Sequence, residues 1–568
     1  MELLPGQRGH RKQEPQDMPH GATMMIRTYQ GLVPTFADRE TWTTSQVLRH
    51  RATSHGNAVY LDCPEEGLSW TYAEMHEAAA RIAGTLVESD GSPGDRLLIM
   101  LPNSSRFIRT WLGCAMAGVV EVPINLAYQG QFLEHQISTV TPRFAVIDAA
   151  YTERFIKSKS ACETIEHFWV AGPGANSGIA ALQGAGWKAE PWDALEASTP
   201  IEPADISPRD LASIFFTSGT TGPSKGVMMP HAQMYFFADE CVSLTRLTDS
   251  DTYQVATPLF HGNAQFLAAY PALIAGARFV LYSHFSASRW IDQIRSSKAT
   301  VTNFLGVMMD FVWNQEPKPN DADNNLRCIF AAPTAHSIID GFKTRFGIEA
   351  FVEVFGLTET SMPILSPYGE DRPPGAAGLA VEDWFDVRLV DPETDEEVAV
   401  GELGELVIRP KVPWTCSMGY FEMPDKTAEA WRNLWFHTGD GMRRDADGWY
   451  YFVDRLKDSL RRRGENISSY EVEQVLLAHP AITECAVVAV KVEIEAGEDE
   501  VMAWLITSTQ INPTELLSWA ETRMPSFAVP RYVEFVDELP MTPSEKVQKV
   551  ELRKRGVSAS TYDHQATQ

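Results

Sequence analysis

The sequence predicts a layered α/β protein, with a large N-terminal domain of α/β sheets followed by a small mobile C-terminal α+β domain. The first observation is its length, because 568 residues exceed what one hydrophobic core usually supports. The second is an alternation of helical-period stretches with short β-rich runs from about residue 42 to 410. The third is a change of pattern after Arg455. We therefore expect a large domain over residues 26–455 and a small domain over residues 456–568, with the boundary at 455–458.

The elements of the large domain follow in order. Residues 1–25 are polar and lack an apolar run, which predicts a disordered extension and neither a secretory signal nor a membrane span. Helical spacing covers residues 72–88 and 105–118, and β-rich runs cover 96–100, 144–147 and 279–282. This alternation predicts a parallel sheet flanked by helices. Turn-forming residues predict surface loops at 197–209, 314–325 and 365–378.

The longest apolar stretch, residues 266–282, is interrupted by Pro271, Gly276 and Arg278 and is too short to cross a bilayer. We expect a buried helix followed by a strand there. In the small domain, the pattern predicts helices at 469–479 and near 513–522, strands around 485–490 and 502–506, and a charged tail.

Composition bounds the function. With 44% hydrophobic and 22% charged residues, the chain is typical of globular proteins. A formal charge of -27, from 75 acidic and 48 basic residues, disfavours nucleic acid and anionic membranes as partners. Any anionic ligand must therefore be held by local cations, backbone N–H groups or a metal.

The 7 cysteines are widely spaced and include no CxxC pair. This spacing favours reduced thiols in a cytoplasmic protein and gives no indication of a zinc site.

A short apolar strand at residues 211–216 leads into a run rich in glycine and hydroxyl groups, which ends at Lys225. Its members are Thr217, Ser218, Gly219, Thr220, Thr221, Gly222, Pro223, Ser224, Lys225 and Gly226. Such a run can cradle phosphate, because glycines permit close approach and N–H and hydroxyl groups donate to oxygen. It is not a Walker A loop, since Ser224 stands where that pattern has glycine. An ordinary exposed turn is the alternative.

This run resembles the signature of the adenylate-forming superfamily of acyl-CoA synthetases, luciferases and peptide-synthetase adenylation domains. Further matching segments follow in order at residues 331–333, 354–360, 435–440, 451–455 and 463–467. The resemblance extends over nearly the whole chain from about residue 42, and within the superfamily the 452–455 and 463–466 segments are similar to carnitine/crotonobetaine-CoA ligases.

The resemblance implies a nucleotide site. Phe355, with Gly356 beside it, would face adenine, and the backbone of Ala332 and Pro333 would lie on the other side. Thr358 would meet the α-phosphate, and Glu359 would hold Mg²⁺. Asp440 would accept from both ribose hydroxyls, and Arg455 would reach ribose or phosphate oxygens. Each residue also has an explanation without a ligand. Phe355 would be a core aromatic, and Glu359 would complement a helix dipole. Asp440 would belong to a plain turn, and Arg455 would form a surface ion pair.

The resemblance also implies a catalytic lysine on a loop of the small domain. Adenylation brings a carboxylate against a phosphate, and a cation placed there offsets the repulsion. We assign this role to Lys546. The family usually has glycine before this lysine, whereas this chain has Glu545, so Lys549 is the alternative.

Further roles come from the same resemblance. Lys457 would be the hinge about which the small domain rotates between adenylation and thiolation poses. Gly464 and Arg463 would meet coenzyme A. His261 would act in catalysis and line the acyl pocket with Phe304, Gly306 and Met308, and this mostly apolar lining favours an aliphatic, alicyclic or aromatic acid.

The chain is thus expected to be an ATP-dependent acid-CoA ligase of the acyl-CoA synthetase type, of the kind used in fatty acid metabolism, with ATP, Mg²⁺ and coenzyme A as cofactors. Two alternatives remain open: an adenylate-forming enzyme that loads a carrier protein or ends in oxidation, and an inactive nucleotide-binding homologue. A homodimer is one assembly compatible with the sequence, and we expect no integral membrane partner.

Overall fold

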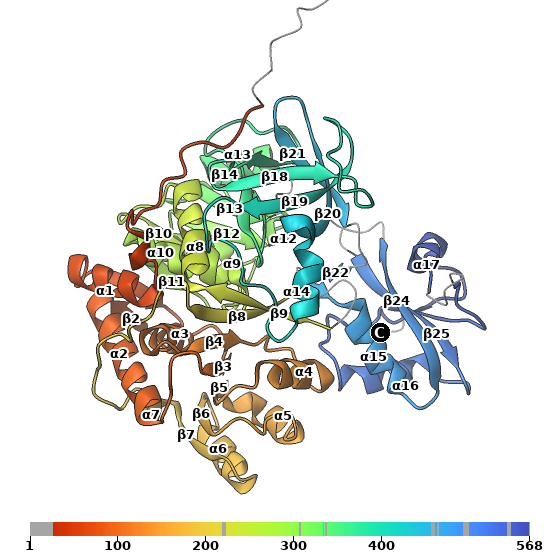
Figure 1. Ribbon diagram of the computed structural model, residues 1–568, viewed down its shortest axis with the longest axis horizontal. Coiled ribbons are helices and arrows are strands. Elements are labelled where there is room, and N and C mark those ends of the chain that lie inside the picture. Colours follow the sequence, from red (N-terminus) through yellow and green to blue (C-terminus); the bar gives the residue numbers. More distant parts are fainter. Residues whose placement is uncertain are drawn as a thin grey trace, which may run out of the picture.

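The computed structural model describes residues 26–566 except 218–222, 306–307, 333, 335–337, 456–459, 463–464, 492–498 and 542–546. Within these residues, three seven-stranded sheets form the large domain, and a four-stranded sheet, a two-stranded sheet and three helices form the small C-terminal domain (Figure 1). The expected fold class is confirmed. The proposed boundary after Arg455 stays a prediction, because residues 456–459 lie outside the described part of the chain.

One sheet of the large domain runs in the order β7-β6-β5-β3-β4-β8-β9. Its strands pair in parallel except at the β8–β9 edge, which is an antiparallel hairpin. The strand bounds are β3 (Arg96–Met100), β4 (Val120–Pro123), β5 (Phe144–Asp148), β6 (His167–Ala171), β7 (Lys188–Pro191), β8 (Leu211–Thr217) and β9 (Lys225–Pro230).

A second sheet has the order β14-β13-β12-β10-β11-β1-β2 and is parallel except for the β1–β2 pair. Its strands are β1 (Val59–Cys63), β2 (Leu68–Thr71), β10 (Thr252–Val255), β11 (Arg278–Leu281), β12 (Val301–Leu305), β13 (Cys328–Ala332) and β14 (Ala350–Val352). Both sheets agree with the expected parallel sheet between helices.

The third sheet, β15-β16-β17-β21-β20-β19-β18, is antiparallel at every pair whose register the structure gives. Sequence rhythm alone predicted parallel strands here. Several of the connections are too short for a crossover helix, and such connections can join only antiparallel strands. The strands are β15 (Val354–Leu357), β16 (Ser361–Leu365), β17 (Ala376–Ala380), β18 (Phe385–Val390), β19 (Gly404–Pro410), β20 (Phe436–Arg444) and β21 (Trp449–Arg455).

Local sequence fixes the ends of the principal helices. A capping box starts α2 (Tyr72–Glu88), in which Thr71 and Glu74 satisfy each other's backbone N–H groups. The helix α3 (Ser105–Ala117) begins at a Ser104 cap and ends at Gly118, whose φ of 71° suits glycine. The other large-domain helices are η1 (Arg39–Thr41), α1 (Thr44–Ser54), α4 (Gln131–Val140), η2 (Ala149–Tyr151), α5 (Thr152–Lys157), α6 (Ala175–Gly184), α7 (Trp192–Leu195), α8 (His231–Thr245), α9 (Gly262–Ala264), η3 (Gln265–Ala269), α10 (Tyr270–Ala275), α11 (Trp290–Ser297), α12 (Met308–Trp313), α13 (Ile339–Phe346), α14 (Pro424–Ala430) and η4 (Arg432–Leu434).

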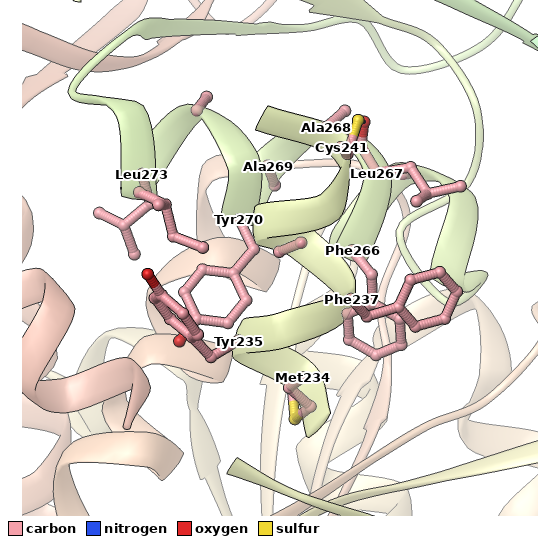
Figure 2. Packing of buried hydrophobic residues seen from close by; sticks show 14 of the residues in the cluster. Met234, Tyr235, Phe237, Cys241, Phe266, Leu267, Ala268, Ala269, Tyr270 and Leu273 are labelled. Atoms are coloured by element: carbon pink, nitrogen blue, oxygen red, sulfur yellow. The ribbon is translucent and has the colours of Figure 1, made fainter. Parts of the chain in front are cut away.

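The main core joins α8 to the apolar stretch at residues 266–273, as Figure 2 shows. The Phe237 and Phe266 ring centroids lie 5.7 Å apart, and those of Tyr235 and Tyr270 lie 6.4 Å apart. This stretch is the predicted buried helix, here the π-helix η3 followed by α10, and β11 is the strand after it. The core therefore fixes the segment that begins just after His261. No helix within the described residues combines the length and apolar character that a membrane span requires.

The C-terminal domain contains a hairpin, β22 (Leu460–Arg462) and β23 (Glu465–Ile467), next to α15 (Ser469–Leu477). Its four-stranded sheet consists of β24 (Ile482–Lys491), β25 (Asp499–Thr507), β26 (Tyr532–Phe535) and β27 (Tyr562–Asp563), with α16 (Pro513–Glu521) and α17 (Lys549–Arg555). Phe132 of α4 in the large domain is part of its hydrophobic core. The two domains therefore share an apolar contact at α4.

Candidate active site

The described residues that flank the predicted phosphate loop lie at the end of the β8–β9 hairpin. Thr217 and Lys225 are the last residues that pair across it, so their side chains mark the mouth of the loop. Residues 218–222, which include the predicted Ser218, Gly219, Thr220, Thr221 and Gly222, lie outside the described part of the chain. At Gly226 a Cβ atom would come within 2.8 Å of Ile214, so this close pairing favours glycine.

Glu359 lies directly opposite this mouth, on the connection between β15 and β16. The Thr217 hydroxyl donates to Glu359 Oε1 at 3.4 Å, and the Tyr420 hydroxyl donates to the same oxygen at 3.0 Å. The Lys225 ammonium lies 4.3 Å from the Tyr420 ring centroid, which is cation–π range. A hydroxyl, a carboxylate and a cation are thus gathered around one buried phenol, whose pKa is raised by burial and by Glu359.

Sequence reasoning missed Tyr420. The residue sits in a segment that runs beside the phosphate hairpin, with an isolated bridge between Val227 and Tyr420 and a 2.9 Å bond from Tyr420 N–H to the Thr427 hydroxyl. The only signal in the sequence was a Gly-Tyr pair seven residues before Thr427, which carries no chemistry by itself. Only the fold brings this phenol to Glu359.

The predicted adenine and α-phosphate residues lie on β15 and just after it. Phe355 is half-buried and packs against the main core. At Gly356 a Cβ atom would approach the Ser361 carbonyl to 2.4 Å, so glycine is required by the hairpin itself. The Thr358 carbonyl accepts a 2.8 Å bond from the buried Gln233 amide, which fixes the backbone that carries the Thr358 hydroxyl. Ala332 ends β13, and Pro333 lies outside the described residues.

Asp440 is fully buried on β20, and its Cα pairs in register with that of Arg455 on β21. The neighbouring Glu405 holds this strand by accepting from Gly439 N–H at 2.9 Å and contacting His437 Nδ1 at 3.0 Å. Burial would raise the pKa of Glu405, but its hydrogen bond and charge interaction with His437 lower that pKa below the usual value. The predicted ribose residues Asp440 and Arg455 are therefore neighbours on one rigid sheet, which they share with Glu359's flanking strands.

The residues predicted for the acyl pocket divide into two groups. Phe304 is fully buried and packs against Trp290 and Phe342, with ring centroids 5.3 Å and 5.8 Å away, in a separate aromatic cluster. That packing accounts for Phe304 without a ligand. Met308 is half-buried and accepts from Leu305 N–H through its sulfur at 3.4 Å, and Gly306 lies outside the described residues. The acyl-pocket role of all three stays a prediction.

His261 contacts the small domain. Its Nε2 atom lies 3.1 Å from Oε1 of Glu465 on β23, and the Asn125 amide lies 3.4 Å from Oε2 of the same carboxylate. The β22–β23 hairpin thus reaches the segment predicted to line the acyl pocket. The adjoining Arg463 and Gly464, predicted for coenzyme A, and Lys457, predicted as the hinge, lie outside the described residues.

Lys549, the alternative catalytic lysine, is held inside the small domain. Its ammonium lies 2.7 Å from Glu473 Oε1 and donates to the Ser469 hydroxyl at 2.7 Å. These bonds tie α17 to α15, which is a structural role. Lys546 lies outside the described part of the chain, so its role as catalytic cation stays a prediction.

Glu359 places a carboxylate at this mouth, beside Thr217. The described residues contain no group of three or more His, Cys, Asp or Glu side chains that could hold a metal. Mg²⁺ commonly binds through one or two protein carboxylates, with substrate phosphates and water completing its shell. A lone buried carboxylate beside a phosphate-type loop fits that mode of binding.

The protein combines a large α/β domain, a glycine-rich hairpin that faces a carboxylate, and a small domain that contacts the large domain and the hairpin. Together these features define a two-domain adenylate-forming ligase. The comparisons agree, with residues 48–421 matching the AMP-binding enzyme family and residues 471–546 matching the AMP-binding enzyme C-terminal domain. The chain belongs to the AMP-binding enzyme family.

Among curated relatives, the chain is similar to crotonobetaine/carnitine-CoA ligase of Salmonella heidelberg (strain SL476), with 29% identity over 503 residues that cover 87% of this chain and 95% of the relative. Among solved structures, it resembles o-succinylbenzoate CoA synthetase of Bacillus subtilis, with TM-score 0.76, 23% identity and coverage of 90% and 98%. Apo MatB of Rhodopseudomonas palustris gives TM-score 0.64, 26% identity and coverage of 90% and 98%.

Proposed function

We propose that the chain joins a carboxylic acid to coenzyme A at the expense of ATP. The acid's carboxylate oxygen attacks the α-phosphorus of ATP, pyrophosphate leaves, and an acyl-adenylate forms. The sulfur of coenzyme A then attacks the acyl carbon, its proton is lost, and AMP leaves. The observation that carries this proposal is the convergence of Thr217, Lys225, Glu359 and Tyr420 at one mouth in a member of this family.

The proposed roles follow the chemistry of each group. Thr217, Lys225 and the loop between them would hold the β- and γ-phosphates, while Thr358 would donate to the α-phosphate. Mg²⁺ at Glu359 would neutralise phosphate oxygens. Lys546 would lie between the carboxylate and the α-phosphate, where like charges about 4 Å apart repel by about 4 kcal/mol at an effective dielectric near 20.

The substrate is proposed as an aliphatic, alicyclic or aromatic acid without a free α-amino group. In the predicted, mostly apolar lining, the half-buried thioether of Met308 would be adaptable, and the imidazole of His261 would add a polar group. The curated relatives named for crotonobetaine and carnitine support small acids as the first candidates. A cytoplasmic location is supported by seven cysteines that form no disulfide. A homodimer stays a proposal that light scattering on the purified chain tests.

The decisive experiment measures loss of the coenzyme A thiol with ATP and Mg²⁺ over a panel of acids. The panel should hold crotonobetaine, carnitine, benzoates, succinylbenzoate, straight-chain acids and amino acids. Acid-dependent loss of thiol with matching pyrophosphate release supports the ligase. Pyrophosphate release that turns over without coenzyme A would favour the carrier or oxidation alternative, and ATP binding without release for any acid would favour the inactive homologue.

A further inference from the structure

One buried residue close to Glu359 has a left-handed backbone. Ser361 has a φ of 60° and is fully buried, whereas the other non-glycine residues of positive φ that the structure describes are exposed or half-buried. Residues with a side chain rarely adopt this conformation, because Cβ then crowds the following carbonyl oxygen. Glycine is the residue that such a position in a hairpin favours. Serine therefore stands here against the preference of the backbone.

The left-handed turn is built into the hairpin that carries Glu359. Ser361 starts β16 and pairs with Leu357, the last residue of β15, so residues 358–360 form the tip of this hairpin. The Ser361 carbonyl oxygen occupies the space that a Cβ atom at Gly356 would need. The strands of the hairpin are thus shaped around the unusual conformation of Ser361.

Two fully buried side chains of α8 hold the backbone on either side of Glu359. The Gln233 amide donates to the Thr358 carbonyl at 2.8 Å. The Glu240 carboxyl accepts from Met362 N–H at 3.0 Å. The hairpin tip is therefore anchored to the main core before and after the carboxylate.

The Ser361 hydroxyl makes a bond that glycine could not make. Its Oγ atom donates to the Thr415 carbonyl at 2.9 Å, 54 residues further along the chain. Thr415 begins residues 415–421, which we call the strap. In the same strap, Ser417 N–H donates to the Glu359 carbonyl at 2.8 Å. The strap is thus bonded to the hairpin at Glu359 itself and again two residues later.

The strap also lies against β9 of the phosphate hairpin. Three backbone hydrogen bonds of 2.8–2.9 Å join them, from Met418 N–H to the Met228 carbonyl, from Met228 N–H to the Gly419 carbonyl and from Phe421 N–H to the Gly226 carbonyl. Tyr420 of the strap donates its hydroxyl to the Glu359 side chain. The strap therefore connects the hairpin that carries Glu359 to the strand that starts at Lys225.

We propose that Ser361 is a positioning residue, whose hydroxyl holds the strap against the hairpin tip so that the Glu359 carboxylate keeps its direction toward the mouth of the phosphate loop. This inference rests on the proposed function, because it takes Glu359 as the carboxylate that binds Mg²⁺. It accounts for serine at a position that suits glycine, because the bond from the hydroxyl offsets the cost of the left-handed backbone.

The test separates the hydroxyl from the backbone with two substitutions. Ser361→Ala and Ser361→Gly both remove the hydroxyl, but only alanine keeps a side chain in the left-handed conformation. Calorimetry measures ATP binding at several Mg²⁺ concentrations without acid, and thermal unfolding is measured on every variant. Lys298→Gly is the matched control, because Lys298 is exposed and has a φ of 56° at the end of α11.

We expect Ser361→Ala and Ser361→Gly to raise the Mg²⁺ concentration for half-maximal ATP binding equally, by about 5-fold, because both lose the same hydrogen bond. Ser361→Gly should unfold at a higher temperature than Ser361→Ala, since glycine adopts the left-handed conformation without strain. Lys298→Gly should keep the Mg²⁺ requirement of the parent. A purely structural serine would instead give a Mg²⁺ requirement that follows the unfolding temperature.

A second measurement asks whether Ser361 acts through Glu359. At a fixed, subsaturating Mg²⁺ concentration, Ser361→Gly should weaken ATP binding by about 5-fold in the parent. It should cause no further loss when Glu359→Gln is already present, because the two side chains then no longer act as a unit. Equal losses in the two backgrounds would overturn the inference.

The inference would also be overturned by a Mg²⁺ requirement that is unchanged in both serine variants, or that is raised in Ser361→Ala and normal in Ser361→Gly. Either result would leave the ligase proposal intact. Absence of Mg²⁺-dependent ATP binding in the folded parent would instead contradict the proposed roles of Glu359 and of the phosphate hairpin, and with them both proposals.

Discussion

The hydroxyl of Tyr420 donates to Oε1 of Glu359 at 3.0 Å, and both side chains are buried. This bond occupies one oxygen of the carboxylate proposed to hold Mg²⁺ and fixes its orientation. Hydrogen bonds to charged groups contribute about 1.5–3 kcal/mol. We expect Tyr420→Phe to raise the Mg²⁺ concentration for half-maximal ATP binding by about 10-fold, because Glu359 loses its orientation while the ring beneath Lys225 remains.

Calorimetry of ATP binding at several Mg²⁺ concentrations measures this change without any acid. Tyr451→Phe is the matched control, because its hydroxyl bonds to Asp445 at 2.8 Å away from the site. Tyr420→Leu, which also removes the ring, should weaken ATP binding even at saturating Mg²⁺. An unaltered Mg²⁺ requirement in Tyr420→Phe would remove the positioning role from this phenol.

The two lysines near the C-terminus should behave differently. Lys546→Ala is expected to abolish adenylate formation while ATP still binds, because binding does not require the cation that offsets carboxylate–phosphate repulsion. Lys549→Ala should instead destabilise the small domain, because it leaves Glu473, which is only slightly exposed, without its ion-pair partner. Acid-dependent pyrophosphate release and thermal unfolding, measured on both variants, separate the roles. Full activity in Lys546→Ala would transfer the catalytic role to another group.

Much of the fold could be predicted because periodicity reports burial directly. The expected helix at 72–88 and strand at 96–100 match α2 and β3, and the helix at 105–118 differs from α3 only by Gly118, its cap. The loops at 197–209 and 314–325 carry no helix or strand, whereas the loop at 365–378 overlaps the ends of β16 and β17. Strand ends depend on pairing partners, which local sequence does not contain.

The candidate site was predictable only where motifs carry chemistry in consecutive residues. Thr217, Lys225 and Glu359 were found that way, and the structure places them around one mouth. Tyr420 and Ser361 escaped because their partners, Glu359 and Thr415, are 61 and 54 residues away. A contact of that range depends on the packing of sheets and domains. Phe304 shows the converse, since its motif position predicts a pocket residue while its ring packs in an aromatic cluster.

We expect the contact between His261 and Glu465 to affect the reaction only while the two domains have the arrangement seen in the structure, in which β23 reaches His261. Both groups keep some exposure, with 32% and 21% of their side-chain surfaces accessible, so the contact is worth at most about 1 kcal/mol. We expect Glu465→Ala to slow thioester formation from preformed acyl-adenylate by up to about 5-fold. Acid-dependent pyrophosphate release should be unaffected. If both half-reactions slowed equally, the contact would serve stability in general and not this pose.

Glu121 provides a test of buried charge away from the site. It is fully buried, and the Gln265 amide donates to its Oε1 at 2.5 Å. Burial raises its pKa well above the usual value, and the Gln265 bond only partly opposes this. The folded protein therefore keeps Glu121 protonated at pH values where the unfolded chain has ionised it. The free energy of unfolding falls as pH rises above the pKa of this carboxyl in the unfolded chain, about 4.5. The loss is up to about 1.4 kcal/mol per pH unit until the pKa in the folded protein is reached.

Glu121→Gln removes this dependence, because the amide is neutral at every pH and keeps an acceptor for Gln265. The variant's advantage in unfolding temperature over the parent should therefore be small at pH 5 and grow to about 2 °C or more at pH 8. Thermal unfolding followed by circular dichroism at both pH values measures it, with the exposed Glu515→Gln as control for the change in net charge. An advantage of equal size at pH 5 and pH 8 would mean that Glu121 does not titrate differently on folding, since only a proton retained by the native state makes the difference depend on pH.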